Sequence, residues 1–164
     1  MTVHDKIGAM MEEMTQWRRA LHACPETAFT EKETSDYVAD KLLSFGLDIH
    51  RGLAGTGIVA TIQRGEGSSP AIGLRSDIDA LDITEATGLP YASRNEGRMH
   101  ACGHDGHMSM LLGAAKYLAG SDTFRGTVHF IFQPAEENEG GGGRMIREGL
   151  FDRYPLRSVY GLQN

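Results

Sequence analysis

The sequence predicts a layered α/β domain with a largely parallel central sheet. Short apolar, β-branched segments alternate with longer segments in which apolar residues recur every three or four positions. This alternation is typical of buried strands that are interleaved with amphipathic helices. Polar clusters follow the strands or precede the helices, and sites in open α/β sheets form beyond the carboxyl ends of strands. We therefore expect three clusters to converge: Asp77 with Asp79, Cys102 with His104, and Glu136 with Glu137.

Two amphipathic helices are expected before the first strand. Apolar side chains recur at spacings of three and four over residues 7–21, which predicts a helix with one apolar stripe. Pro25 ends it, because proline disfavours helical backbone in the residue before it. A second helix is expected over 30–45, where Thr30 and Glu33 have the spacing of a capping box.

The later part of the chain alternates strands and helices. In order, we expect strands over 57–62 and 71–75, a helix with Met108, Leu111, Leu112, Ala115 and Leu118 on one face, a strand over 127–132, a short helix near 144–148 and a strand near 158–162. The turn-rich segment 65–70 between the first two strands is typical of a hairpin. No internal repeat or linker indicates a second domain, and 164 residues suit one.

Composition excludes several classes of partner. The 16 Lys and Arg against 22 Asp and Glu give a net charge of −6, which disfavours binding to a phosphate backbone, so we expect no nucleic acid. No apolar run approaches the roughly 18 residues of a membrane helix, and the start lacks a signal-peptide pattern. Two cysteines cannot form a disulfide framework, so a reducing cytoplasm and no membrane are expected.

Residues 100–107 concentrate groups that bind metals. They contain three histidines, one cysteine and one aspartate. In extended backbone, positions two apart project to the same side, so Cys102 and His104 could hold one ion. Zinc prefers thiolate and imidazole, whereas manganese or nickel accepts imidazole and carboxylates. Two alternatives stay open. Cys102 could be a buried cysteine near solvated histidines at a helix start, where capping is the simpler role for Asp105 and His107, or it could be a nucleophile with His104 or His107 as its base.

The paired carboxylates suggest divided roles. Adjacent side chains point in different directions, so one of Glu136 and Glu137 could face a metal ion while the other faces a water bound to that ion. A glutamate beside the water can act as general base and then donate the proton to a leaving amine. Asp77 and Asp79 could orient a ligating histidine. Solvated acidic loops are the simpler alternative for both pairs.

Four motifs together make the chain resemble a known family. They are WRRALH at 17–22 with PE at 25–26, RSDIDAL at 75–81, HACGHDGH at 100–107 and FQPAEE at 132–137. In this order they resemble the metallo-amidohydrolases and peptidases that include hippurate hydrolase, N-acyl-L-amino acid amidohydrolase and the indoleacetyl-amino acid hydrolases. The resemblance implies a three-layer, zinc-peptidase-like fold.

The resemblance also implies an activity and a site. It implies a centre of two divalent ions, zinc or manganese, that hydrolyses the amide bond of small N-acyl amino acids such as hippurate. By position, Cys102, His104 and Glu137 look like metal ligands, Glu136 like the general base and Asp79 like the supporting acid. A homodimer is implied for the full-length protein.

Two departures from the family pattern matter. Gln163 stands where the family carries histidine, and an amide oxygen is a weaker ligand, so one metal position should be weakened or lost. Family members are also more than twice as long, so residues 1–164 are interpreted as the N-terminal part of a catalytic domain that lacks its inserted dimerisation (lid) domain and C-terminal part.

Two further functions therefore stay open. The chain could be a catalytically incomplete fragment or a degenerate homologue that binds one ion or none. An aminopeptidase or dipeptidase of the wider superfamily is a third alternative, although Cys102 resembles the amidohydrolase branch more closely.

Overall fold

The computed structural model describes residues 2–65, 71–138 and 140–163. The elements in these ranges are, in chain order, α1 (Val3–Gly8), α2 (Met11–His22), α3 (Lys32–Ser44), β1 (Asp48–Leu53), β2 (Gly57–Arg64), β3 (Ile72–Asp77), α4 (His104–Ala119), β4 (Gly126–Gln133), α5 (Gly141–Arg147), α6 (Leu150–Arg153) and β5 (Ser158–Gly161). Within the described ranges, the helices are all too short or too polar to cross a membrane.

One sheet organises the structure, with strand order β1-β2-β4-β3-β5. Strand β3 pairs in parallel with β4 and β5, whereas β2 pairs antiparallel with β1 and β4. Four of the five described strands therefore point the same way and β2 runs against them. The predicted α/β domain with a mainly parallel sheet is confirmed.

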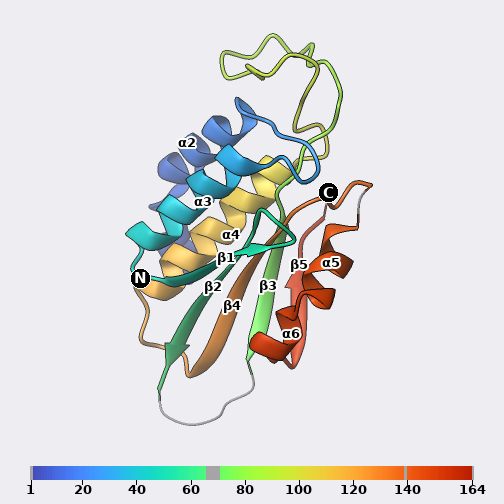
Figure 1. The fold of residues 1–164 in the computed structure, drawn as a ribbon. Helices are drawn as coiled ribbons and strands as arrows, with labels where there is room; N and C mark the ends of the chain where they lie inside the picture. The colour runs from blue at the N-terminus through green and yellow to red at the C-terminus, as the bar shows by residue number, and fades with distance from the viewer. Residues whose placement is uncertain (1, 66–70, 139, 164) are drawn as a thin grey trace.

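Helices cover both faces of the sheet and make three layers. In Figure 1, α2, α3 and α4 lie on one side, and α5 and α6 lie on the other. The period of two along the strands explains this arrangement. Ile58 and Phe130 enter a large core shared with α2, α3 and α4, while Val59 and Ile131 enter a smaller core with Met145 of α5.

The hairpin expected between β2 and β3 does not form a strand pair. Strand β4 lies between them, and its Val128 is opposite Ile62 on one side and Ile72 on the other. Strand β4 is buried more continuously than β3, and the central position in the sheet is the one covered on both sides. Most of the turn itself, residues 66–70, lies outside the described residues.

Two other elements differ from the sequence interpretation. The first helix is divided at Ala9 and Met10 into α1 and α2, and Gly8 at the break is a poor helix former. Strand β1 was not expected, because its sequence DIHRGL is mostly polar and five of its six residues are exposed or half-buried at the sheet edge. The remaining predicted helices and strands are confirmed in position to within a few residues.

The capping box expected at Thr30 is also wrong. Helix α3 begins at Lys32, and the Thr30 hydroxyl donates to the carbonyl oxygen of Thr27. The carboxylate of Glu26 instead accepts the backbone N–H groups of residues 32, 33 and 34 at 3.2, 3.3 and 2.8 Å. A side chain from the preceding loop thus satisfies the free donors of the helix start.

Replacing Glu26 by alanine removes this cap. We expect Glu26→Ala to lower the free energy of unfolding by about 1 kcal/mol, the usual cost of losing a helix N-cap. Urea unfolding followed by circular dichroism measures it. An unchanged midpoint would show that water satisfies the same N–H groups equally well.

Candidate metal centre

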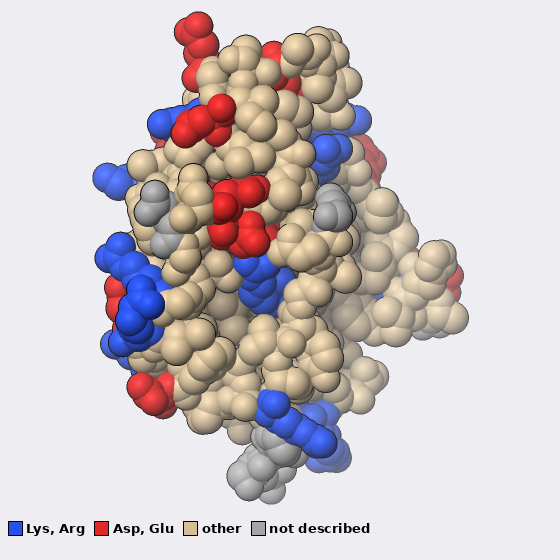
Figure 2. Space-filling view, turned by 90° about the vertical axis from the view of Figure 1, so that its right-hand side faces the viewer, with Lys and Arg blue, Asp and Glu red and all other residues tan. Residues whose placement is uncertain are grey.

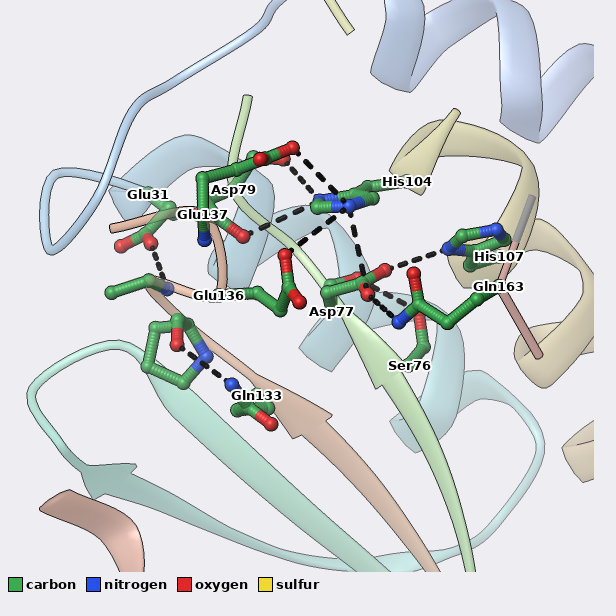
Figure 3. A network of polar contacts seen from close by, with 12 residues as sticks. Glu31, Ser76, Asp77, Asp79, His104, His107, Gln133, Glu136, Glu137 and Gln163 are labelled. Carbon is green, nitrogen blue, oxygen red and sulfur yellow. Dashed lines mark hydrogen bonds and ion pairs between the residues drawn. The ribbon is translucent and has the colours of Figure 1, made fainter. Parts of the chain in front are cut away.

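The predicted site residues meet at one edge of the sheet. Strands β3 and β4 are parallel neighbours, and Asp77 at the end of β3 lies opposite Gln133 at the end of β4. The chain leaving each strand therefore carries Asp79 and Glu136 to the same edge, and α4 begins there with His104. Figure 3 shows the side chains of Asp77, Asp79, Glu136 and His104 facing one another.

His104 is the centre of this group. Its Nδ1 lies 2.8 Å from the backbone carbonyl oxygen of Asp79, so that nitrogen carries the proton and donates it. Its Nε2 faces three carboxylates, at 3.6 Å from Glu137 Oε1, 3.6 Å from Asp77 Oδ2 and 3.9 Å from Glu136 Oε2. Because Nδ1 carries the proton, the lone pair of Nε2 points toward these carboxylates. The imidazole is fully buried.

Two of these buried acceptors have no protein partner. Within the described residues, neither His104 Nε2 nor Glu137 Oε1 makes a hydrogen bond. Each such atom costs about 1 to 3 kcal/mol when it is left unsatisfied. A cation between them would satisfy both, and one ligand atom from each of Cys102, His104 and Glu137 lies within 4.8 Å of the others. Sulfur, nitrogen and oxygen donors in this arrangement fit a zinc-like ion.

The protonation of the cluster reflects its negative charge. Burial raises the pKa of the Cys102 thiol to about 11, and the neighbouring Glu137 and Glu136 add to the shift. Burial alone would lower the pKa of His104, but the bond to Asp79 and the charges of Asp77 and Asp79 outweigh it and raise the pKa. Both shifts oppose metal ligation, and a bound divalent ion would reverse them.

A second group of potential ligands overlaps the first. Asp77, His104 and His107 also bring ligand atoms within 4.8 Å of one another. The Asp77 carboxylate, however, accepts hydrogen bonds at 2.8 Å from Arg75 Nη1, His107 Nδ1 and Gln163 Nε2. Arg75 already balances its charge, and the single lone pair of His104 can serve one ion. Of the two groups, Cys102, His104 and Glu137 therefore fit an ion better.

The two glutamates differ in exposure. The Glu136 side chain is 34% exposed and that of Glu137 is 19% exposed, so Glu136 is more open to water. Asp79 is fully buried, and its Oδ2 accepts the backbone N–H of Glu137 at 3.0 Å. Burial raises the pKa of Asp79, but the bonds from His104 and from the Glu137 and Glu136 backbone outweigh it and lower the pKa.

Negative charge also gathers on the outer surface. Figure 2 views the side that carries β5 and α5 in Figure 1, and acidic side chains lie together near the middle of this face, above a basic one. A negative field attracts cations.

The corner that carries both glutamates is tightly held. Ala135 has a left-handed backbone with φ of 52°, which costs a non-glycine residue about 1 to 2 kcal/mol. Its N–H donates to Glu31 Oε1, and its carbonyl oxygen accepts the N–H of Gly141, both at 2.9 Å. A Cβ on Gly141 would lie 1.8 Å from the Pro134 carbonyl oxygen, so the close approach of α5 requires glycine there.

Two residues expected to cap α4 have other partners. The N-cap is Gly103, and no side chain makes a capping bond to it. Asp105 instead accepts bonds from Arg18 Nε at 2.9 Å and His22 Nδ1 at 2.8 Å, and His107 donates to Asp77. Both side chains tie α4 to other segments of the chain, Asp105 to α2 and His107 to the end of β3.

Sequence reasoning also missed His22 and Glu31 as parts of this network. His22 bridges Asp105 and, at 3.3 Å, Glu85. His22 lies in the motif at 17–22 and Glu31 lies outside every motif, and the partners of both are far along the chain. The one available signal is a polar side chain inside or next to an apolar helical pattern.

The chain belongs to peptidase family M20/M25/M40, whose family model matches residues 73–164. The family resemblance inferred from the motifs is confirmed. The matched segment carries all five predicted site residues as well as Gln163.

The relatives are hydrolases and deacetylases. Hippurate hydrolase of Campylobacter jejuni is 44% identical over the whole chain, and N-acetyl-L-cysteine deacetylase of Bacillus subtilis is 43% identical over 96% of it. The chain spans 42% and 38% of these proteins, about two-fifths of their length.

Solved structures agree in fold. YXEP of Bacillus subtilis, described as a dinuclear metal-binding peptidase of the M20 family, superposes with a TM-score of 0.89 at 38% identity, covering 96% of this chain and 44% of that one. An aminohydrolase structure from methicillin-resistant Staphylococcus aureus gives 0.91 at 39% identity, covering 97% and 41%.

The close packing at Gly141 provides a test of the corner. We expect Gly141→Ala to lower the free energy of unfolding by about 2 kcal/mol or more, because the added methyl overlaps backbone. Gly143→Ala in the same helix meets only the flexible Arg147 side chain at 3.3 Å and should raise it by about 0.5 to 1 kcal/mol. Equal effects in urea unfolding would contradict the packing described for Gly141.

Proposed function

We propose that residues 1–164 are the N-terminal part of the catalytic domain of a metal-dependent amidohydrolase that cleaves N-acyl amino acids. One observation carries the proposal: His104 Nε2 and Glu137 Oε1, which have no partner among the residues that the structure describes, face each other at 3.6 Å beside Cys102 and Glu136. In this proposal, a dimerisation (lid) domain and the C-terminal catalytic part lie outside this chain. The relatives support it, because the chain covers only about two-fifths of their length.

The proposed roles are those that the family resemblance implies, and the geometry of the site supports them. Cys102, His104 and Glu137 hold a divalent ion, zinc or manganese, which when bound polarises the scissile carbonyl and acidifies water. Glu136, the more exposed carboxylate, takes the proton of the attacking water at its Oε2 side and delivers it to the departing amine. Asp79 supports the site by holding His104 through its backbone carbonyl and Glu137 through its carboxylate.

The substrate class is proposed from the relatives. Hippurate, N-acetylcysteine and N-acetyldiaminopimelate share an acyl group on the amine of an amino acid, and the corresponding enzymes are 42–44% identical to this chain. We infer a small N-acyl amino acid as substrate, with a cytoplasmic, homodimeric full-length enzyme.

A second candidate is a chain that binds one ion and does no chemistry. Gln163 favours it, because the side chain directs its amide nitrogen to Asp77, and the amide oxygen that remains is a weaker ligand than an imidazole nitrogen. The dinuclear centre described for the Bacillus subtilis structure would then be incomplete here.

Substitution of Glu136 separates proton transfer from metal binding. We expect Glu136→Gln in the full-length protein to lower kcat on hippurate or an N-acetyl amino acid by about 100-fold or more, since general base catalysis contributes that much. Metal content should stay unchanged. Cys102→Ser should instead lower metal content, and Glu12→Gln on the exposed face of α2 serves as the control. Near-full activity of Glu136→Gln would refute the proposed role.

Substitution of Gln163 tests the number of ions. We expect about one zinc ion per chain in the wild type, measured by mass spectrometry after dialysis, and a rise toward two in Gln163→His. An imidazole nitrogen is a stronger ligand for zinc than an amide oxygen. Gln63→His, on the exposed side of β2, should leave the number unchanged. Two ions in the wild type would contradict the weakened position and favour the two-metal enzyme.

A further inference from the structure

We propose that Glu31 is a positioning residue of the candidate metal centre, whose carboxylate fixes the backbone from which Glu136 and Glu137 project. The inference rests on the proposed function, because it treats Glu137 as a metal ligand and Glu136 as the base. Glu31 itself touches neither the ion nor the reacting atoms.

The contacts of Glu31 reach far along the chain. Its Oε1 accepts the backbone N–H of Ala135 at 2.9 Å, and its Oε2 accepts the hydroxyl of Thr56 at 2.7 Å. The side chain is fully buried. Figure 3 shows it directed at the backbone that leads into Glu136 and Glu137.

The side chain of Glu31 does not serve its own helix. It makes no capping bond to α3, although Glu31 is the N-cap residue, and Glu26 satisfies the helix start instead. Burial raises the pKa of Glu31, and its hydrogen bonds offset only part of that effect. A buried carboxylate is thus costly at this place, and its strong, charge-assisted bond is directed to the corner.

Two carboxylates hold the corner between them. Glu31 binds the N–H of Ala135 and Asp79 binds the N–H of Glu137. The left-handed backbone of Ala135 persists only where its surroundings determine it. Without the Glu31 acceptor, the buried N–H of Ala135 loses its partner, and relaxation of this residue would move Glu137 Oε1 away from His104 Nε2.

The test compares three variants of the full-length protein. Zinc affinity is measured by competition with a chromophoric chelator, and stability by urea unfolding. We expect Glu31→Ala to weaken zinc binding about tenfold or more, as loss of a group that orients a ligand does. Glu31→Gln should restore affinity, because its amide oxygen can accept from Ala135 while its nitrogen donates to Thr56. Glu26→Ala destabilises the start of α3 but should leave the affinity unchanged.

The outcomes distinguish the two proposals. Wild-type affinity in folded Glu31→Ala, or an equal loss in Glu26→Ala, would overturn the positioning role. If Glu31→Ala does not fold, Glu31→Asp keeps the charge but shortens its reach, and the same loss is expected. If the wild type binds no zinc, the proposed function fails. Hydrogen exchange then decides: faster exchange of the Ala135 and Glu137 N–H groups in the variant supports positioning, and unchanged exchange refutes it.

Discussion

The hydrogen bond from His104 Nδ1 to the carbonyl oxygen of Asp79 determines the rest of the candidate centre. It fixes which ring nitrogen carries the proton and turns the other toward the carboxylates. Because the acceptor is a backbone atom just beyond β3, the orientation of the ring depends on the sheet itself rather than on a mobile side chain. Both possible ion positions use the same lone pair, so this bond also limits how many ions the described residues can share.

The centre lies at the ends of neighbouring strands, and three buried carboxylates hold the backbone and side chains around it. Asp79 and Glu31 each accept a backbone N–H from the corner after β4, while Asp77 collects donors from three sides. These acids orient backbone and side chains, which leaves Glu137 and Glu136 with free oxygen atoms. In the proposed centre, carboxylates that hold the backbone and side chains are therefore distinct from those that would bind the ion or activate water.

The sequence allowed much of this to be predicted, and the failures have physical causes. The period of apolar residues predicts α4 and β4, because their burial dictates that period, and local motifs predict the convergence of Cys102, His104 and Glu137. The strand order was not predictable from the turn-rich segment at 65–70. A turn reverses the direction of the chain after β2, but it does not determine whether β3 or a later strand pairs with β2. The capping box at Thr30 and Glu33 was wrong because Glu26 caps the helix from six to eight residues away, which lies outside a four-residue pattern. The partner of Glu31 is Ala135, which only the tertiary structure brings near.

The insertion of β4 between β2 and β3 has a consequence for how the chain reaches its native state. The two earlier strands cannot complete the sheet as they are synthesised; their central partner follows only after the whole of α4. Such non-local pairing slows folding and leaves strand edges open in the meantime. Because the same late step brings the corner with Glu136 and Glu137 to His104, an ion that bound them would stabilise the finished sheet selectively and draw folding to completion.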